Sequence, residues 1–130
     1  MQQVRGTLNH VELIGWLGDA PEQRVFASGA RMCSFSIATR RFGARNEQGT
    51  REFDTEWTTV ESWDRLGEQC SESLGKGSRV HVCGNLQTRS WEDRDTGQRR
   101  SRTIVRATSV LFLEPRPETA DTDEVVEDVA

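Results

Sequence analysis

The chain has 130 residues, of which 34% are hydrophobic and 29% are charged. This length allows one globular domain with a core of its own but not two. No apolar run approaches the roughly 18 residues of a membrane helix, and the opening MQQVRGTLNH lacks the apolar stretch of a signal peptide. We therefore expect a cytoplasmic protein that makes no membrane contact.

The net charge of −4 is divided unevenly along the chain. Residues 1–113 carry 16 Lys and Arg against 14 Asp and Glu, which is +2, whereas residues 114–130 carry one Arg against seven acids, which is −6. All but one of the basic residues are arginines, whose planar guanidinium stacks on rings and grips phosphate. We expect residues 1–113 to form the folded domain and residues 114–130 to be a disordered acidic tail.

The amino-terminal part of the chain alternates as β-strands do. Apolar residues alternate over residues 11–17, and this strand ends at the turn sequence Gly-Asp-Ala-Pro. Residues 23–42 predict a hairpin around Ser28-Gly29, and the polar residues 43–54 predict a long flexible hairpin loop. The hairpin side chains expected to face inward are Cys33, Phe35 and Ile37.

The stretch TEWTTVESW, residues 55–63, predicts a strand with an unusual face. Side chains on a strand repeat every two residues, so Trp57, Glu61 and Trp63 share one side, and Val60 lies on the other. Two tryptophans beside a charge indicate either a half-buried face or a surface that binds something flat and apolar.

The remainder of the domain predicts one short helix and two more strands. Asp64 can cap the helix and Gly75 can end it. The apolar helical stripe is Leu66, Cys70 and Leu74. Residues 78–93 and 98–113 form the last two strands, joined by a turn at Arg-Asp-Thr-Gly. The first of these strands has Val80, Val82 and Leu86 on one side and Asn85, Gln87, Arg89 and Trp91 on the other.

This order of elements predicts an all-β OB-fold, a five-stranded Greek-key barrel with one short helix between strands 3 and 4. Periodicity alone also allows a small β-sandwich, and the position of the lone helix favours the barrel.

We expect no enzyme, metal site or cofactor. The cysteines are odd in number and far apart, with no C-x-x-C pair, so they predict small buried apolar residues: Cys33, Cys70 and Cys83. His10 and His81 lie in strand-like stretches and predict ordinary, partly buried residues. The Gly-Lys-Gly-Ser at residues 75–78 lacks the earlier glycine of a phosphate loop, because position 70 is cysteine. No nucleophile, metal-ligand or dinucleotide motif is present.

Several aromatic residues have a cation close by in the sequence. Phe42 follows Arg40 and Arg41, and the other pairs are Trp63 with Arg65 and Trp91 with Arg89. Rings that stack bases, interleaved with cations that hold phosphates, form a groove for single-stranded nucleic acid. Alternatively, the rings cap the barrel or contact another protein. Duplex binding is disfavoured because no basic helix is present to enter a major groove.

The segments LNHVELIGWLGDAPEQR, FSIATRRF and TEWTTVESWDRLGEQCSESLGKGSRVHVCGNLQTRSWED resemble the bacterial and mitochondrial single-stranded DNA-binding protein family, over roughly residues 4–113. The resemblance implies a homotetramer that coats single-stranded DNA in replication, recombination and repair, near the bacterial nucleoid. By motif, the family's stacking residues correspond to Trp57, Trp63, Trp91 and approximately Phe42. Its phosphate contacts fall near Arg65, Lys76 and Arg89, and we add Arg40 and Arg41 to the predicted interface.

The chain also departs from the family pattern. Trp16 stands where a small polar residue is usual, which suggests a contact with a neighbouring subunit, and Gly67 in the helical stretch predicts a weak helix. The tail has acids but lacks the usual apolar tip with proline and phenylalanine, so either it does not recruit replication and repair proteins or it does so more weakly through Val125, Val126 and Val129. The same tail is expected to compete with DNA. The alternative function is an OB-fold protein-interaction adaptor, a primosome-type paralogue, with the tryptophans as interface anchors.

Overall fold

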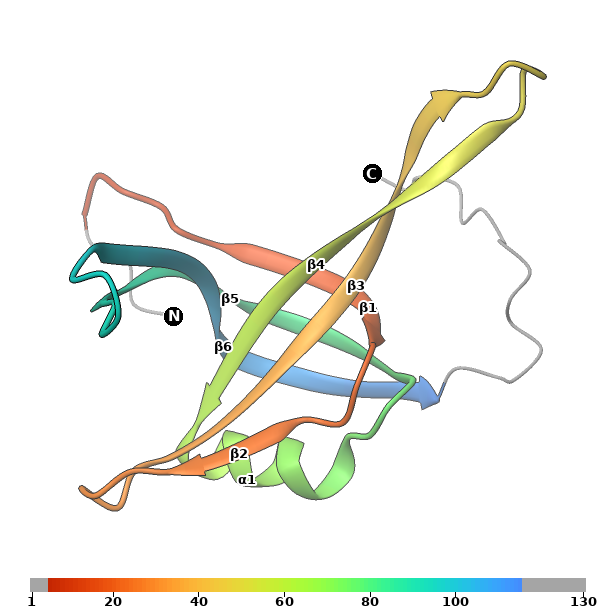
Figure 1. Cartoon of the computed structure of the whole chain (residues 1–130). Helices are drawn as coiled ribbons and strands as arrows, with labels where there is room; N and C mark the ends of the chain where they lie inside the picture. Colours follow the sequence, from red (N-terminus) through yellow and green to blue (C-terminus); the bar gives the residue numbers. More distant parts are fainter. Residues whose placement is uncertain (1–4, 116–130) are drawn as a thin grey trace.

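The computed structural model describes residues 5–115, drawn in Figure 1. The elements in chain order are β1 (Val11–Leu17), β2 (Glu22–Val25), β3 (Arg31–Arg45), β4 (Arg51–Trp63), α1 (Asp64–Ser73), β5 (Ser78–Glu92) and β6 (Arg99–Pro115). Apart from the last two residues of β6, the expected tail lies outside the described residues. No helix in the described part of the chain has the length and apolar character needed to cross a membrane.

The strands form one sheet, in the order β1-β5-β6-β4-β3-β2, that closes on itself. β1 pairs with β5 along its length, and its last residues, Trp16 and Leu17, also pair with β3, which closes the barrel. β4 meets β6 in a short parallel contact between Val60 and Val105. The predicted OB-fold is confirmed. The structure has six strands because the predicted hairpin contributes two of them, β2 and β3, and β2 has only four residues. Counting only the longer strands, the helix follows the third one, β4, as predicted.

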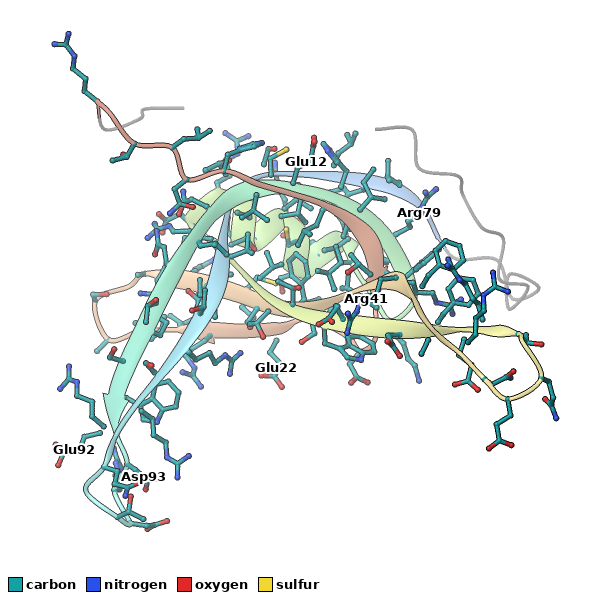
Figure 2. All side chains as sticks on the ribbon, turned by 90° about the horizontal axis from the view of Figure 1, so that it is seen from above. Glu12, Glu22, Arg41, Arg79, Glu92 and Asp93 are labelled. Carbon is teal, nitrogen blue, oxygen red and sulfur yellow. The ribbon has the colours of Figure 1, made fainter. Side chains whose placement is uncertain are left out.

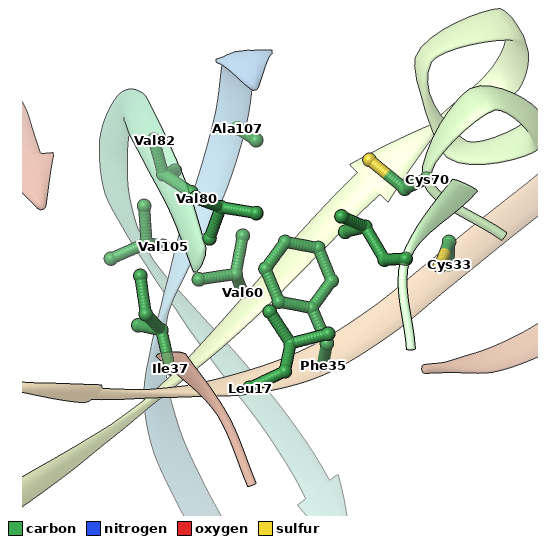
Figure 3. Packing of buried hydrophobic residues seen from close by; sticks show 11 residues of the cluster. Leu17, Cys33, Phe35, Ile37, Val60, Cys70, Val80, Val82, Val105 and Ala107 are labelled. Atoms are coloured by element: carbon green, nitrogen blue, oxygen red, sulfur yellow. The ribbon is translucent and has the colours of Figure 1, made fainter. Parts of the chain in front are cut away.

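The core is built from alternate positions of these strands (Figure 3). Each of its main side chains is less than 5% exposed: Leu17, Cys33, Phe35, Ile37, Val60, Val80, Val82 and Val105. Cys70 of α1 and Leu74, the C-cap residue of this helix, cover one end of this cluster. The inward face predicted for β3 is thus confirmed, whereas Leu86, predicted on the same side of its strand as Val80 and Val82, is 49% exposed and does not belong to the core. The pairing of β5 with β6 shifts at Cys83/Gly84, and Leu86 lies beyond that shift.

The helix packs more tightly than its composition suggests. A methyl group at Gly67 would lie 2.6 Å from the carbonyl oxygen of Ser62, so glycine lets α1 lie directly on the end of β4. The glycine is therefore required for packing, although it lowers intrinsic helix propensity. The predicted Asp64 cap is wrong. Trp63 is the N-cap residue, and no side chain makes a capping hydrogen bond at this end of the helix. Asp64 is instead the first residue of α1 and has a positive φ of 56°.

The expected flexible loop over residues 43–54 is instead a continuation of two strands. β3 runs to Arg45 and β4 starts at Arg51, and together they form the long twisted ribbon that extends from the barrel in Figure 1. Asn46 organises the turn between them, because its Oδ1 accepts hydrogen bonds from the backbone N–H groups of Gln48 (3.0 Å) and Thr50 (2.9 Å). Such local side-chain bonds are how asparagine stabilises turns.

Candidate nucleic-acid interface

A cleft of about 590 Å³ lies between β2 and β4 of the barrel and the β5–β6 arm. We call it the arginine cleft. Its charged and aromatic lining consists of Glu22, Arg24, Glu61, Arg89, Trp91 and Arg102. In Figure 2 the arm, with Glu92 and Asp93 at its tip, descends on the same side of the barrel as Glu22. Strands far apart in sequence thus place three cations and one indole ring around a single concave surface.

One of the three arginines is tied to a buried carboxylate. Glu61 is only 9% exposed, and Arg89 donates to its Oε1 from Nε at 3.2 Å and from Nη2 at 2.5 Å. A buried carboxylate needs such a partner, because removing the partner lowers the free energy of unfolding by about 3–5 kcal/mol. Arg89 therefore holds the cleft together, whereas Arg102 makes one neutral contact there, donating from Nη2 to Oγ1 of Thr59 at 2.8 Å.

Two of the predicted stacking tryptophans are exposed. Trp57 is 58% exposed and Trp91 is 44% exposed. The Trp57 ring lies directly on Gly18, since a methyl group there would come within 2.5 Å of the indole. Contact with the backbone on one side restrains this ring while more than half of the residue stays open to solvent. Trp91 also lines the arginine cleft. It lies two residues after Arg89 on β5, so both side chains project from the same face of this strand.

Trp63 differs from these two because its ring already has partners within the chain. Phe26 stacks on it with ring centroids 5.5 Å apart and an interplanar angle of 14°. The guanidinium carbons of Arg89 and Arg106 lie 5.6 and 5.4 Å from the same centroid. Such cation–π contacts stabilise a fixed ring orientation. Trp63 thus forms the support beneath the cleft, and a base would have to displace one of these groups to stack on it.

A second, more open cleft of about 430 Å³ lies on the β3–β4 ribbon, lined by Arg40, Arg51 and Phe53, among others. Phe42 packs on Phe53 with centroids 5.2 Å apart, and Arg51 lies 5.2 Å from the centre of the Phe42 ring. Phe42 nevertheless remains 49% exposed. The ribbon therefore carries its own combination of rings and cations, separate from the arginine cleft.

The remaining predicted cations are spread over other parts of the fold. Arg41 is on the ribbon and pairs with Glu56 (Nε to Oε1, 3.0 Å), an exposed pair of the kind that contributes little. Arg65 is exposed in the first turn of α1, and Lys76 is exposed in the turn after it. Neither Arg65 nor Lys76 lines either cleft.

The fold brings four further residues to this region that the local sequence pattern did not indicate: Arg24, Phe26, Arg102 and Arg106. Arg24 lies on β2, Phe26 directly follows this strand, and the two others lie on β6. The pairing of Glu61 with Arg106 across the parallel β4–β6 contact determines where the two β6 arginines lie. The sequence does show that arginines recur along β6. Which face of the sheet they occupy depends on the register between β6 and its neighbours β4 and β5, and local sequence does not specify that register.

The cysteines match the prediction only in part. Cys33 and Cys70 are buried as expected, whereas the expected burial of Cys83 is wrong: its side chain is half-buried beside His81 and Glu12. The prediction failed because Cys83 lies on the side of β5 opposite the buried Val80 and Val82. The sequence motifs gave no sign that these three residues would meet, yet their ligand atoms lie within 4.8 Å of one another.

The model of the single-strand binding protein family matches residues 8–113. Single-stranded DNA-binding protein 1 of Chlorobaculum tepidum is 41% identical over 106 residues, covering 82% of this chain and 65% of the relative. Single-stranded DNA-binding protein 1 of Nostoc is 33% identical over 107 residues, covering 82% of this chain and 84% of the relative. The chain thus spans just under two thirds of the Chlorobaculum protein.

Two solved structures are similar in fold. The Plasmodium falciparum SSB in complex with ssDNA matches with a TM-score of 0.74 at 26% identity, covering 86% of this chain and all of that one. A deletion mutant of the single-stranded DNA binding protein from Thermus aquaticus matches with a TM-score of 0.69 at 30% identity, covering 82% of this chain and 51% of that one.

Proposed function

The chain belongs to the single-strand binding protein family, and we propose from this premise that it binds single-stranded DNA with little sequence preference. The observation that supports this most directly is the arginine cleft, where three guanidiniums and an exposed indole face one concave surface. Every base has a ring face that can stack on such an indole, so binding tolerates sequence. The protein is a binding protein in this proposal, and no residue is assigned a catalytic step.

Stacking contributes more than net charge to this binding mode. The charged lining of the arginine cleft has three arginines but also Glu22 and Glu61, so its surplus is one positive charge. Each stacked base contributes about 1–3 kcal/mol, whereas each phosphate neutralised on a single strand adds a log–log salt slope of about −0.7. We assign stacking to Trp57 and Trp91, with Phe42 on the ribbon, and a supporting role to Trp63.

The proposed strand path connects the arginine cleft with the ribbon. Arg24, Arg89 and Arg102 line the cleft, and Arg40 and Arg41 lie on the ribbon. Arg65 and Lys76 would contact phosphates only if the strand continues around the barrel. In this function the protein coats strands exposed during replication, recombination and repair in the cytoplasm, with residues 114–130 as an acidic tail that competes with DNA and recruits partner proteins.

Tryptophan fluorescence tests this proposal directly. Adding an oligo-dT strand should quench emission, because bases stack on exposed indoles, and affinity should fall with salt. Arg102→Gln should reduce the salt slope by about 0.7, the contribution of one phosphate. The matched control is Arg31→Gln, since Arg31 pairs with Glu68 of α1 and does not line the arginine cleft. Arg89→Gln is unsuitable, because it also leaves the buried Glu61 unpaired.

Unchanged fluorescence at saturating oligo-dT would contradict DNA binding and favour the protein-interaction adaptor. An effect of Arg31→Gln as large as that of Arg102→Gln would contradict the assignment of the cleft while leaving DNA binding itself intact.

We also propose that the protein assembles as a homotetramer through the outer face, defined as the side of β1, β5 and β6 that carries Glu12, Ile14, His81 and Leu111. Ile14 is 50% exposed and Leu111 is 59% exposed, and both are neighbours of His81 in the sheet register. Exposed apolar side chains that lie side by side on a sheet are typical of protein contacts. The half-buried Trp16, with Arg79 5.9 Å from its ring, lies at the end of β1 next to this face.

Ile14→Glu is expected to shift the assembly to smaller species, because it places a carboxylate in the proposed contact. Light scattering at several protein concentrations measures the mass. Leu8→Glu is the matched control, since Leu8 is 77% exposed but precedes β1. A mass that stays unchanged in Ile14→Glu, or falls equally in both variants, would contradict the outer face as the contact.

A further inference from the structure

Three potential metal ligands converge on the outer face, away from both clefts. Nε2 of His81 lies 2.7 Å from Oε2 of Glu12, and Sγ of Cys83 lies 3.7 Å from the same oxygen. The distance from this Sγ to Nε2 of His81 is 3.8 Å. The three ligand atoms thus form a small triangle with one nitrogen, one oxygen and one sulfur.

The strand register produces this convergence. His81 and Cys83 are two residues apart on β5, so their side chains project from the same face. Glu12 of β1 is paired directly with Cys83 in the antiparallel register. Side chains at such opposed positions lie within reach of one another. The backbone pairing therefore holds all three ligands, and no loop has to become ordered to bring them together.

We propose that Glu12, His81 and Cys83 bind one zinc ion per chain, with water at the fourth position. Carboxylate, imidazole and thiolate are all zinc ligands, and the softer thiolate disfavours magnesium or calcium. Neither the fold nor the proposed DNA binding requires this ion. The inference is therefore separate from the proposed DNA binding, although its ligands lie on the face proposed above as the contact between chains.

The geometry fits a tetrahedral ion with little rearrangement. Zinc lies about 2.3 Å from sulfur and about 2.0–2.2 Å from nitrogen and oxygen, so tetrahedral ligand atoms are roughly 3.3–3.6 Å apart. The two distances from Sγ already lie close to this range. The Nε2–Oε2 distance must lengthen, which happens when the ion replaces the hydrogen bond between these atoms.

Cys83 is also the thiol best placed to act as a ligand. Burial raises the pKa of Cys33 to about 11 and also raises the pKa of Cys70, which disfavours their thiolates. Cys83 is half-buried and reaches the surface.

The site lies on the opposite side of the barrel from the arginine cleft. Figure 2 shows Glu12 on the convex side of the arch formed by β1 and β5, whereas Glu22 of the cleft lies below the arch. Zinc here would connect β1 to β5, two strands that already pair. Metal binding and DNA binding are therefore expected to be separable by mutation.

Cobalt, a spectroscopic substitute for zinc, provides the test. The full chain, kept reduced with a phosphine, is titrated with Co²⁺, and a thiolate-to-cobalt charge-transfer band should appear and saturate at one ion per chain. Zinc should displace the cobalt and abolish the band. Cys83→Ser should remove the band although Cys33 and Cys70 remain, and circular dichroism checks that this variant is folded.

Glu12→Gln provides a second variant at an exposed position, so its folding is not at risk. It should keep the cobalt band but weaken zinc binding by about tenfold or more, since even outer-shell partners contribute 10–100-fold. Glu22→Gln is the matched control and should leave zinc affinity unchanged. Absence of a thiolate band, its persistence in Cys83→Ser, or saturation at half an ion per chain would overturn the proposal. Oligo-dT binding measured on Cys83→Ser and Glu12→Gln should not change, since neither residue lines the arginine cleft.

Discussion

Replacing Gly15 with alanine is expected to destabilise the barrel by about 3 kcal/mol or more, the upper range for overpacking a closed core. A Cβ at this position would lie 2.1 Å from the carbonyl oxygen of Ala38. Gly15 pairs with Val80 of β5 and directly precedes Trp16, where β1 also pairs with Ala38 of β3, so the backbones of β1 and β3 approach closely there. The clash is with backbone, and relieving it would require β1 to move away from β3.

Urea unfolding followed by circular dichroism measures this loss, with all variants at one protein concentration because assembly adds to apparent stability. Gly75→Ala is the matched control, since no atom lies within 4 Å of its added methyl group. A Gly15→Ala variant as stable as this control would show that the β1–β3 contact does not close the barrel.

Trp57→Ala and Trp91→Ala are each expected to weaken oligo-dT binding by about 1–3 kcal/mol, or roughly fivefold to 150-fold in Kd. Both rings are largely exposed, so little of the free energy of unfolding depends on them. Trp63→Ala should behave differently. It removes the support for Phe26, Arg89 and Arg106 and should lower stability as well as affinity.

Fluorescence anisotropy of a labelled oligo-dT measures these affinities independently of the tryptophans, and urea unfolding reports stability. Trp57→Phe and Trp91→Phe are the matched controls, because a phenyl ring keeps a stacking face and should retain most of the affinity. If the Phe variants bind as poorly as the Ala variants, stacking is not the source of the loss. Unfolding of Trp57→Ala would identify that ring as part of the core.

Local sequence was sufficient where a pattern has a short period. Alternation identified the strands of the barrel and the inward face of β3, and the helical stripe identified α1. The same alternation placed Trp57 away from Val60, because adjacent side chains on a strand point to opposite faces. The resemblance to a known family supplied the expected DNA-binding function and the candidate stacking residues, which periodicity alone left open.

The tertiary structure decided how those strands meet. It turned the expected loop over residues 43–54 into a ribbon, placed Arg24 and Arg102 in the cleft with Arg89, and engaged Trp63 with Phe26. It also brought Glu12 to Cys83 from 71 residues away. These outcomes depend on register and closure between strands distant in sequence, and a shift of one residue would turn each side chain to the opposite face.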